Sequence, residues 1–420
     1  MSFTISYENC EYRGEGNAGL VIRLKKEEKV LRLTKQDNAC KITRSKEVQF
    51  KELESKVEVI QNVMKFLLGQ DLMQCPIIVF LSKEDIWVIN CVANKFRPDF
   101  RRHKSVKEED SYVLMLPDYC SLPPHLKNYP SFGPVISVEI KPKQGFMLQD
   151  EFSLPGQSFV PMRMCRFCMM QQYKVKQGVI SEKSGYCPTD LYSGCPIRMR
   201  HSLKMLLKTP QNNFRIFKDQ KLIYSEEKKS NLSDVLSDFF DVNDKLSYSD
   251  LLCTLIIQVL IRPLEAVSLP ISSAKKVSQM CINAYSGCSK FDPCHFLPVG
   301  CVLDKILRVQ TLASFCISDV YSLYLKIKSC STHQRFNSIG CYARSEFPPY
   351  LGEPDKHPDE TDYQYASRKV WEFLVALTVK DCSIMLVLSV FLKVLSQNIV
   401  RMLSRMEMGI FTFFPLLLWI

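Results

Sequence analysis

Short apolar runs separated by charged turns dominate the first 118 residues of the chain. Four of these runs alternate or are β-branched and predict strands, at residues 19–25, 29–35, 75–81 and 111–116. The third run is apolar almost throughout, which predicts a buried strand. Between the second and third runs, apolar side chains recur at helical spacing over residues 48–69, and Gly69 ends the predicted helix. This part of the chain is therefore expected to be β-rich with one helix.

The remainder of the chain predicts more helix than strand. Helices are expected at residues 247–262, within 301–329 and at 363–380. Strands are predicted at residues 135–140, 214–224 and 381–388. The second of these is expected to be a hairpin that turns near Asp219. No internal repeat is evident, so the pattern predicts an α+β fold.

A proline-rich connector divides the chain into two predicted lobes. We expect an N-lobe at residues 1–118, a connector at 119–134 and a C-lobe at 135–386. A Ser-, Pro- and Cys-rich stretch at about 263–300 is interpreted as a variable insertion in the C-lobe. Residues 387–420 are expected to form an apolar tail.

The charge balance favours anionic partners. Lys and Arg number 55 against 44 Asp and Glu, so the formal net charge is +11. Aromatic residues are not interleaved with the basic ones, so we predict no specific nucleic-acid binding. The 18 cysteines and a polar N-terminus predict reduced thiols and a cytoplasmic and nuclear location. The apolar run at 409–420 is too short to span a bilayer, so no transmembrane segment is expected.

The segment EIKPKQG, residues 139–145, places a glutamate and two lysines at the end of a predicted strand. Side chains alternate along a strand, so Glu139, Lys141 and Lys143 are expected on the face opposite the core. Two interpretations stay open. One is an ordinary strand with a solvated face. The other is a phosphate-binding or phosphoryl-transfer site, for which lysine ammonium groups are suited.

The segment YRGEGNA, residues 12–18, places two glycines between predicted strands. Glycine lets a backbone approach a phosphate and offer its amides. A tight hairpin turn is the simpler interpretation, because glycine is common in turns. Arg32 is central in a following strand, where protein kinases carry a phosphate-binding lysine. The kinase triplets H-R-D and D-F-G are absent from the sequence, which argues against an ordinary protein kinase.

Longer motifs follow the glycine turn in order: VISVEIKPKQGF, CRFCMMQQYK, YCPTDLYSG, PQNNFRIF and TVKDCSIM. Together they closely resemble the inositol-pentakisphosphate 2-kinase family of vertebrate type, collinearly from about residue 7 to residue 386. The resemblance implies a two-lobed inositol polyphosphate kinase fold, distantly protein-kinase-like, with a β-rich N-lobe and a larger mixed C-lobe. It implies ATP-dependent phosphorylation of inositol 1,3,4,5,6-pentakisphosphate at the 2-hydroxyl, which gives inositol hexakisphosphate (phytate). ATP and Mg²⁺ are the implied cofactors, and a monomer is expected.

The resemblance also implies roles for individual residues. The catalytic residues would be Lys141, between the γ-phosphate and the acceptor, and Asp381, near Mg²⁺ and the acceptor hydroxyl. The nucleotide-binding residues would be Gly14, Glu15, Gly16, Asn17, Arg32, Leu116, Pro117, Asp118, Glu139 and Asn212. The substrate-binding residues would be Arg97 or Arg101, Lys143, Lys174, Asn213 and Arg215. Which arginine of RPDFR matches the family is left open.

Cysteine spacing raises a separate question of zinc. Cys165 and Cys168 form a C-x-x-C pair, with Cys187 and Cys195 beyond it, and tetrahedral zinc sites use such spacings. A looser group consists of Cys281, Cys288, Cys294, His295 and Cys301. The histidine that the plant pattern places at the hinge is Tyr119 here. Reduced, partly buried thiols are therefore preferred, and a bound zinc ion is the less favoured alternative.

The sequence departs from the family after residue 386. There the family continues with a segment like L-D-L-D-x-K-P that supplies a second metal-binding aspartate, whereas 387–420 contains no aspartate. Loss of a metal ligand weakens charge neutralisation in phosphoryl transfer. A catalytically impaired inositol-polyphosphate-binding protein or scaffold is therefore the alternative function. The tail itself is interpreted as an exposed apolar segment or as a membrane-surface anchor.

Overall fold

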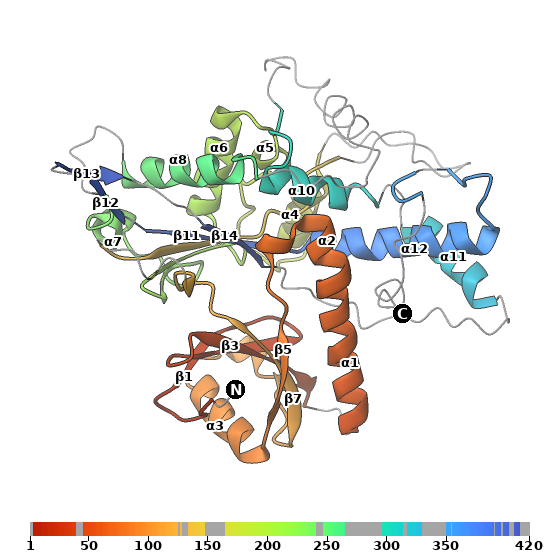
Figure 1. The fold of residues 1–420 in the computed structure, drawn as a ribbon, viewed down its shortest axis with the longest axis horizontal. Coiled ribbons are helices and arrows are strands. Elements are labelled where there is room, and N and C mark those ends of the chain that lie inside the picture. The colour runs from red at the N-terminus through yellow and green to blue at the C-terminus, as the bar shows by residue number, and fades with distance from the viewer. Residues whose placement is uncertain are drawn as a thin grey trace.

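Two five-stranded antiparallel sheets organise the molecule (Figure 1). The computed structural model describes residues 3–38, 45–124, 127, 133–147, 164–240, 247–264, 296–313, 317–329, 350–353 and 355–389, together with three backbone strands beyond residue 390. Most of the predicted insertion at 263–300 lies outside the described residues. The α+β class expected from the sequence is confirmed by this alternation of antiparallel sheets and helices.

The first sheet lies wholly within the N-terminal 118 residues. Its strands, in spatial order, are β1 (Cys10–Glu15), β2 (Gly19–Leu24), β3 (Lys29–Thr34), β7 (Ser111–Pro117) and β5 (Ile77–Leu81). The four predicted strands are confirmed, but the prediction that the third is buried is wrong. β5 is an edge strand, so Ile77 and Phe80 remain 48% and 46% exposed. Two short strands, β4 (Gln36–Asp37) and β6 (Lys104–Ser105), pair with each other beside this sheet.

Two helical segments accompany the first sheet, where the sequence predicted one. The predicted helix comprises α1 (Lys46–Glu58), a π-helical turn (Val59–Met64) and α2 (Lys65–Leu68), and Gly69 follows it with a φ of 129°. The second helix, α3 (Lys83–Asn94), was missed. Its signal is the capping box in which Ser82 and Asp85 bond each other's backbone amides.

The second sheet combines strands from three distant parts of the chain. In spatial order they are β10 (Lys221–Tyr224), β9 (Phe214–Lys218), β8 (Ile136–Ile140), β11 (Ser383–Leu388) and β14 (Glu407–Phe411). β8 is central, and all five of its residues are buried. The solvated face that the pattern allowed for this strand is therefore absent. The tail contributes β14 to the sheet edge, and β12 (Phe391–Leu395) pairs with β13 (Asn398–Met402).

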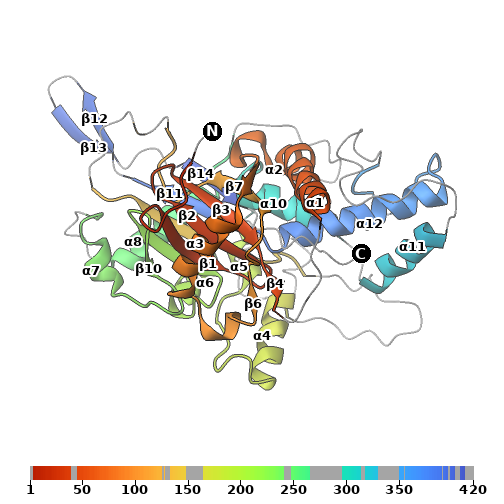
Figure 2. The same ribbon diagram turned by 90° about the horizontal axis from the view of Figure 1, so that it is seen from below.

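Helices cover the second sheet and form the larger hydrophobic core with it. They are α4 (Arg166–Lys176), α5 (Pro188–Leu191), α6 (Pro196–Lys208), α7 (Leu232–Leu236), α8 (Tyr248–Leu260), α10 (Val302–Gln310) and α12 (Asp362–Val379). A further helix, α11 (Ile317–Ser329), packs on α12 in a separate, smaller core. The π-helical turn and α2 also pack into this core, so the first long helix joins both parts (Figure 1). α11 lies along α12 (Figure 2). Among the helices that the structure describes, none has the length and hydrophobicity that a membrane crossing requires.

A buried ion network fixes α12, the helix that leads directly to Asp381. Arg368 donates two hydrogen bonds to Glu360, at 2.6 and 2.7 Å, and one to Glu372 at 3.2 Å. Lys369 also bonds Glu372, at 2.8 Å. All four side chains are buried, so each charge depends on its partners for stabilisation.

Replacement of Arg368 by methionine should destabilise the protein, because the buried Glu360 would lose its main partner and Glu372 would lose one of its two cations. We expect Arg368→Met to lower the free energy of unfolding by about 3 kcal/mol, measured by urea denaturation at neutral pH. The matched control is Lys356→Met, which removes an exposed pair with Asp362 and should cost no more than about 0.5 kcal/mol. Equal losses of unfolding free energy in the two variants would show that the buried network stabilises the protein no more than an exposed ion pair does.

Candidate active site

Strand β8 brings a buried carboxylate into the middle of the second sheet. In the antiparallel register, Glu139 lies opposite Arg215 of β9 and Met385 of β11. Ser383 Oγ donates a hydrogen bond to Glu139 Oε1 at 3.0 Å, and Arg215 Nη1 lies 3.4 Å from Glu139 Oε2. Because a buried carboxylate needs such partners, Glu139 holds the Arg215 guanidinium at the end of the sheet.

β8 runs into a tight turn, residues 141–145, which we call the lysine turn. The backbone amide of Lys141 donates a hydrogen bond to Asn213 O at 2.9 Å, and Tyr186 Oη donates one to Pro142 O at 2.7 Å. These bonds anchor the beginning of the turn to the segment before β9 and to the buried aromatic core. The proline ends the strand as expected, because it offers no amide proton.

The second half of the lysine turn has an unusual backbone. Lys143 has a φ of +61°, which a non-glycine residue adopts only where surrounding contacts hold it. At Gly145 a Cβ atom would lie 2.5 Å from carbon atoms of the Tyr192 ring. The turn therefore requires glycine at this position, which explains the ending of the EIKPKQG motif.

The two lysines of the turn lie near a carboxylate, Asp381, that comes just before the neighbouring strand β11. Lys143 Nζ lies 2.6 Å from Asp381 Oδ1. Burial lowers the pKa of Lys141, and repulsion from Lys143 and Arg215 lowers it further, whereas Glu139 and Asp381 oppose this effect. We call Lys141, Lys143 and Arg215 the cation cluster. Two predicted carboxylates and three predicted cations are thus brought together from β8, β9 and the start of β11.

The glycine-rich turn between β1 and β2 lies beside the cation cluster. Gly14 has a φ of 150° where the register of the two strands shifts. A Cβ atom on Gly14 would lie 3.7 Å from Arg215 Nη1, which places the first sheet's turn against a cation of the second sheet. Gly16 N donates a hydrogen bond to Gly19 O at 2.8 Å and closes the hairpin. The turn is therefore a hairpin that also adjoins the cluster.

Beneath the glycine turn, Glu15 is held by two cations. Arg97 donates to both carboxylate oxygens, at 2.9 and 3.0 Å, and Lys35 donates to one of them. Burial alone would raise the pKa of Glu15, but the hydrogen bonds and charges of Arg97 and Lys35 lower it overall. Arg97, one of the two candidate substrate-binding arginines, is therefore engaged in supporting the turn. The other, Arg101, lies with its guanidinium over the Phe100 ring at 5.0 Å.

The expected adenine hinge, Leu116 to Asp118, comprises the last two residues of β7 and the residue after it. Asp118 is buried and pairs with Arg23 of β2 and with Arg13 of β1. Arg13 also donates a hydrogen bond to Gln220 O and lies 5.3 Å above the Phe217 ring of β9. This ion group therefore ties the first sheet to the second. No role for Arg13 was predicted from the sequence, although it directly precedes Gly14 in YRGEGNA.

The remaining predicted residues lie around this centre in different environments. Arg32 is central in β3, and its burial lowers its pKa to about 10. Asn17 accepts a hydrogen bond from Lys104 Nζ at 3.2 Å. Asn213 is buried, and its Oδ1 accepts no hydrogen bond from the described residues. Asn212 and Lys174 are exposed, and Lys174 lies in the last turn of α4.

Comparison with known protein families gives a match over most of the chain. The family model described as inositol-pentakisphosphate 2-kinase matches residues 12–405. The chain belongs to the inositol-pentakisphosphate 2-kinase family. The match extends beyond residue 386, where the resemblance in the motifs ends, and reaches past β13.

Individual members of the family are similar to the chain over much of its length. A protein of Danio rerio named inositol-pentakisphosphate 2-kinase is 29% identical over 90% of this chain and 82% of its own length. One of the same name from Arabidopsis thaliana is 27% identical over 78% of this chain and 63% of its own length. One from Drosophila melanogaster is 28% identical over 54% of this chain and 50% of its own length.

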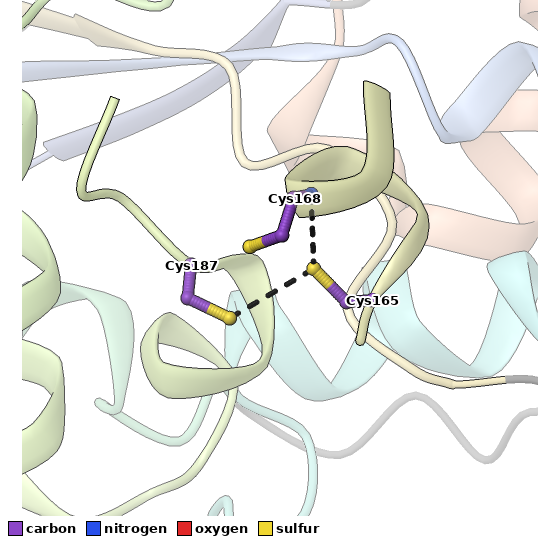
Figure 3. Close-up of side chains that lie close together, drawn as sticks. All are labelled: Cys165, Cys168 and Cys187. Carbon is purple, nitrogen blue, oxygen red and sulfur yellow. Dashed lines mark hydrogen bonds between the residues drawn. The ribbon is translucent and has the colours of Figure 1, made fainter. Parts of the chain in front are cut away.

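Three of the cysteines noted in this family member form a cluster on α4 and before α5. The sulfur atoms of Cys165, Cys168 and Cys187 point toward one another within 4.8 Å (Figure 3). Hydrogen bonds from Cys165 and then Cys168 hold the pKa of the Cys187 thiol well below its usual range. Cys195 is not part of this group. Three thiols would supply three of the four ligands of a structural zinc site, and no fourth His, Cys, Asp or Glu ligand joins them among the described residues.

Lys380, next to Asp381, makes the stability of this region depend on pH. Burial, assisted by the charge of Arg166, lowers the pKa of Lys380 from 10.5 to about 8, and its ammonium group lies 5.1 Å from the Phe146 ring centre. Below about pH 8 the ammonium is charged in both the folded and the unfolded state, so folding bears the full cost of its burial. As the pH rises from 8 toward 10.5, the folded state loses the proton first and the cost declines.

We therefore expect Lys380→Met to raise the free energy of unfolding relative to the parent protein at pH 7, and by much less at pH 10. Urea denaturation at the two pH values measures both differences. Lys51→Met, at an exposed position of α1, serves as the control and should show no such dependence. A stabilisation of equal size at both pH values would contradict the lowered pKa.

Proposed function

We propose that the chain transfers the γ-phosphate of ATP to the 2-hydroxyl of inositol 1,3,4,5,6-pentakisphosphate and forms inositol hexakisphosphate. Membership of the inositol-pentakisphosphate 2-kinase family supports this activity. The observation that carries it to particular residues is the cation cluster, Lys141, Lys143 and Arg215, which adjoins the glycine turn and Asp381. Phosphoryl transfer between two polyanions requires concentrated positive charge at the point where they meet.

In this proposal the cation cluster positions the phosphate in transfer and the phosphates of the acceptor. Lys141 neutralises the phosphate in transfer, because it lies at the centre of the charged groups at this end of the second sheet. Lys143 and Arg215 hold phosphates of the acceptor, as do Asn213 and Lys174 at its edges. One of Arg97 and Arg101 was expected to bind the acceptor. We assign this role to Arg101, because Arg97 is bonded to Glu15.

Asp381 orients the acceptor hydroxyl and accepts its proton in this proposal. Its carboxylate is half exposed, so an acceptor hydroxyl can reach it, and the ion pair with Lys143 holds it in place. The same carboxylate fits Mg²⁺, which prefers oxygen ligands. When bound, Mg²⁺ would supply charge neutralisation at the phosphate oxygens.

On the nucleotide side, the glycine turn and β3 are proposed to cover ATP. Gly14, Gly16 and Asn17 would offer backbone groups to the phosphates, with Arg32 behind them, and Leu116 to Asp118 would lie beside adenine. This arrangement corresponds to a two-lobed fold that is distantly protein-kinase-like. A monomer in the cytoplasm and nucleus completes the proposal. Zinc is not included, because reduced thiols remain the preferred interpretation of the cysteine cluster.

A binding protein or scaffold for inositol polyphosphates is the second candidate. It is favoured by the absence of any aspartate in 387–420, where the family pattern has a second metal ligand. In this alternative the cation cluster would hold the inositide without turnover. Turnover and binding must therefore be measured on the same protein.

Transfer of labelled γ-phosphate from ATP to inositol 1,3,4,5,6-pentakisphosphate tests the proposal. We expect labelled hexakisphosphate from the parent chain and a kcat/KM about 100- to 1,000-fold lower for Lys141→Ala, since one charge partner of the transition state is removed. Lys51→Ala, which removes an exposed lysine of α1, should match the parent.

If no product forms, inositide binding measured by calorimetry distinguishes the two candidate functions. Inositide binding without turnover would overturn the kinase proposal in favour of the binding protein. Neither turnover nor binding would overturn both. Equal activity of the parent and Lys141→Ala would remove the cation cluster from the mechanism.

A further inference from the structure

A fully buried glutamine, Gln310, contacts the backbone of the lysine turn. It is the last residue of α10, and 0% of its surface is exposed. Its Nε2 donates a hydrogen bond to Lys143 O at 2.8 Å, and its Oε1 accepts one from Gly145 N at 2.9 Å. A single side-chain amide thus satisfies both a donor and an acceptor of the same turn, as a partner strand would.

The position of these bonds is significant because Lys143 has a φ of +61°. Such a backbone conformation persists only when its surroundings impose it. The two bonds of Gln310 hold the backbone that follows this Cα, at the carbonyl of Lys143 and at the amide of Gly145. The Tyr192 ring closes the far side of the turn against Gly145. The left-handed conformation at Lys143 is therefore maintained chiefly by Gln310 and Tyr192.

The backbone of Lys143 determines where its side chain can reach. In the observed turn, Lys143 Nζ lies 2.6 Å from Asp381 Oδ1. A relaxed, right-handed backbone at this residue would direct the side chain elsewhere, because the Cα–Cβ bond rotates with φ. Gln310 also lies within 3.5 Å of Val379 O, two residues before Asp381. The glutamine thus contacts the backbone near both members of the ion pair.

We propose that Gln310 is a positioning residue, which sets the lysine turn so that Lys143 and Asp381 face each other in the site. The proposal rests on the proposed function of that site. Gln310 touches neither nucleotide nor inositide in this account and acts through the backbone of Lys143. A glutamine that merely satisfies its own hydrogen bonds in the core would stabilise the fold without affecting the Lys143–Asp381 geometry.

The variant Gln310→Glu distinguishes a positioning role of the glutamine from a purely structural one. It keeps the size of the side chain and an oxygen that accepts from Gly145 N. It removes the donor to Lys143 O and places a carboxylate oxygen against that carbonyl oxygen. The matched control is Asn90→Asp on α3, where a buried amide also donates to a backbone carbonyl, Val106 O, at 2.9 Å. Gln310→Met, which removes both bonds at similar volume, is the second variant if the first does not fold.

The first readout needs no substrate. Acylation of lysines by acetic anhydride, followed by mass spectrometry, reports how well each ammonium group is held. We expect Lys143 to react faster in Gln310→Glu than in the parent, relative to the exposed Lys51, and at the parent rate in Asn90→Asp. An unchanged rate at Lys143 in both Gln310 variants would overturn the proposal.

The second readout is turnover of inositol 1,3,4,5,6-pentakisphosphate. We expect kcat of Gln310→Glu to fall about 100-fold, as for misplacement of a reacting group by about 1 Å, with the KM for ATP unchanged. Asn90→Asp should keep the parent kcat even if its melting temperature falls equally. Equal losses of kcat in both variants would assign Gln310 to fold stability alone. If the parent shows no turnover, the proposed function fails, and the acylation rates still decide the role of Gln310.

Discussion

The mutual repulsion of three cations at one end of the second sheet is the constraint on which the rest of the site depends. Lys141, Lys143 and Arg215 lie near one another beside two carboxylates, and the pKa of Lys141 is lowered first by burial and then further by repulsion from the other two cations. Glu139 and Asp381 compensate part of this charge. A polyanionic ligand would neutralise the remaining positive charge. Binding of such a ligand would therefore be strengthened by relief of the repulsion between the three cations.

The fold stabilises this unfavourable assembly from several directions. Hydrogen bonds from Tyr186 and Gln310 fix the backbone of the lysine turn, and Tyr192 occupies the space where a side chain at Gly145 would lie. The buried network of Arg368 anchors the helix that ends before Asp381. The supports of the site are therefore buried hydrogen bonds and ion pairs, which are costly to break.

Much of this could be predicted from the sequence because it is encoded locally. Alternation and helical spacing identified β2, β3, β7, β9, β10 and β11, and the motif EIKPKQG pointed to Lys141 and Lys143. Local pattern could not show that β5 is an edge strand or that β8 is central, since sheet order arises from pairing of distant segments. For the same reason a solvated face stayed open for β8.

The supporting residues were harder to find than the charged ones. Gln310 lies 165 residues from the amide it binds at Gly145, and Arg13 lies 105 residues from Asp118. Neither belongs to a pattern of spacing within its own segment. Such residues become visible only when tertiary contacts bring them to the site. The engagement of Arg97 by Glu15 is a further case, because sequence alone treated Arg97 and Arg101 alike.

The central claim is that the cation cluster receives the inositide beside the glycine turn. A crystal structure of the protein, from crystals soaked with inositol 1,3,4,5,6-pentakisphosphate, would test it most directly. The account predicts phosphate groups within hydrogen-bond distance of Lys143 and Arg215, with the ring near Asp381. An inositide bound elsewhere, with the Lys143–Asp381 and Glu139–Arg215 pairs intact and uncovered, would contradict it.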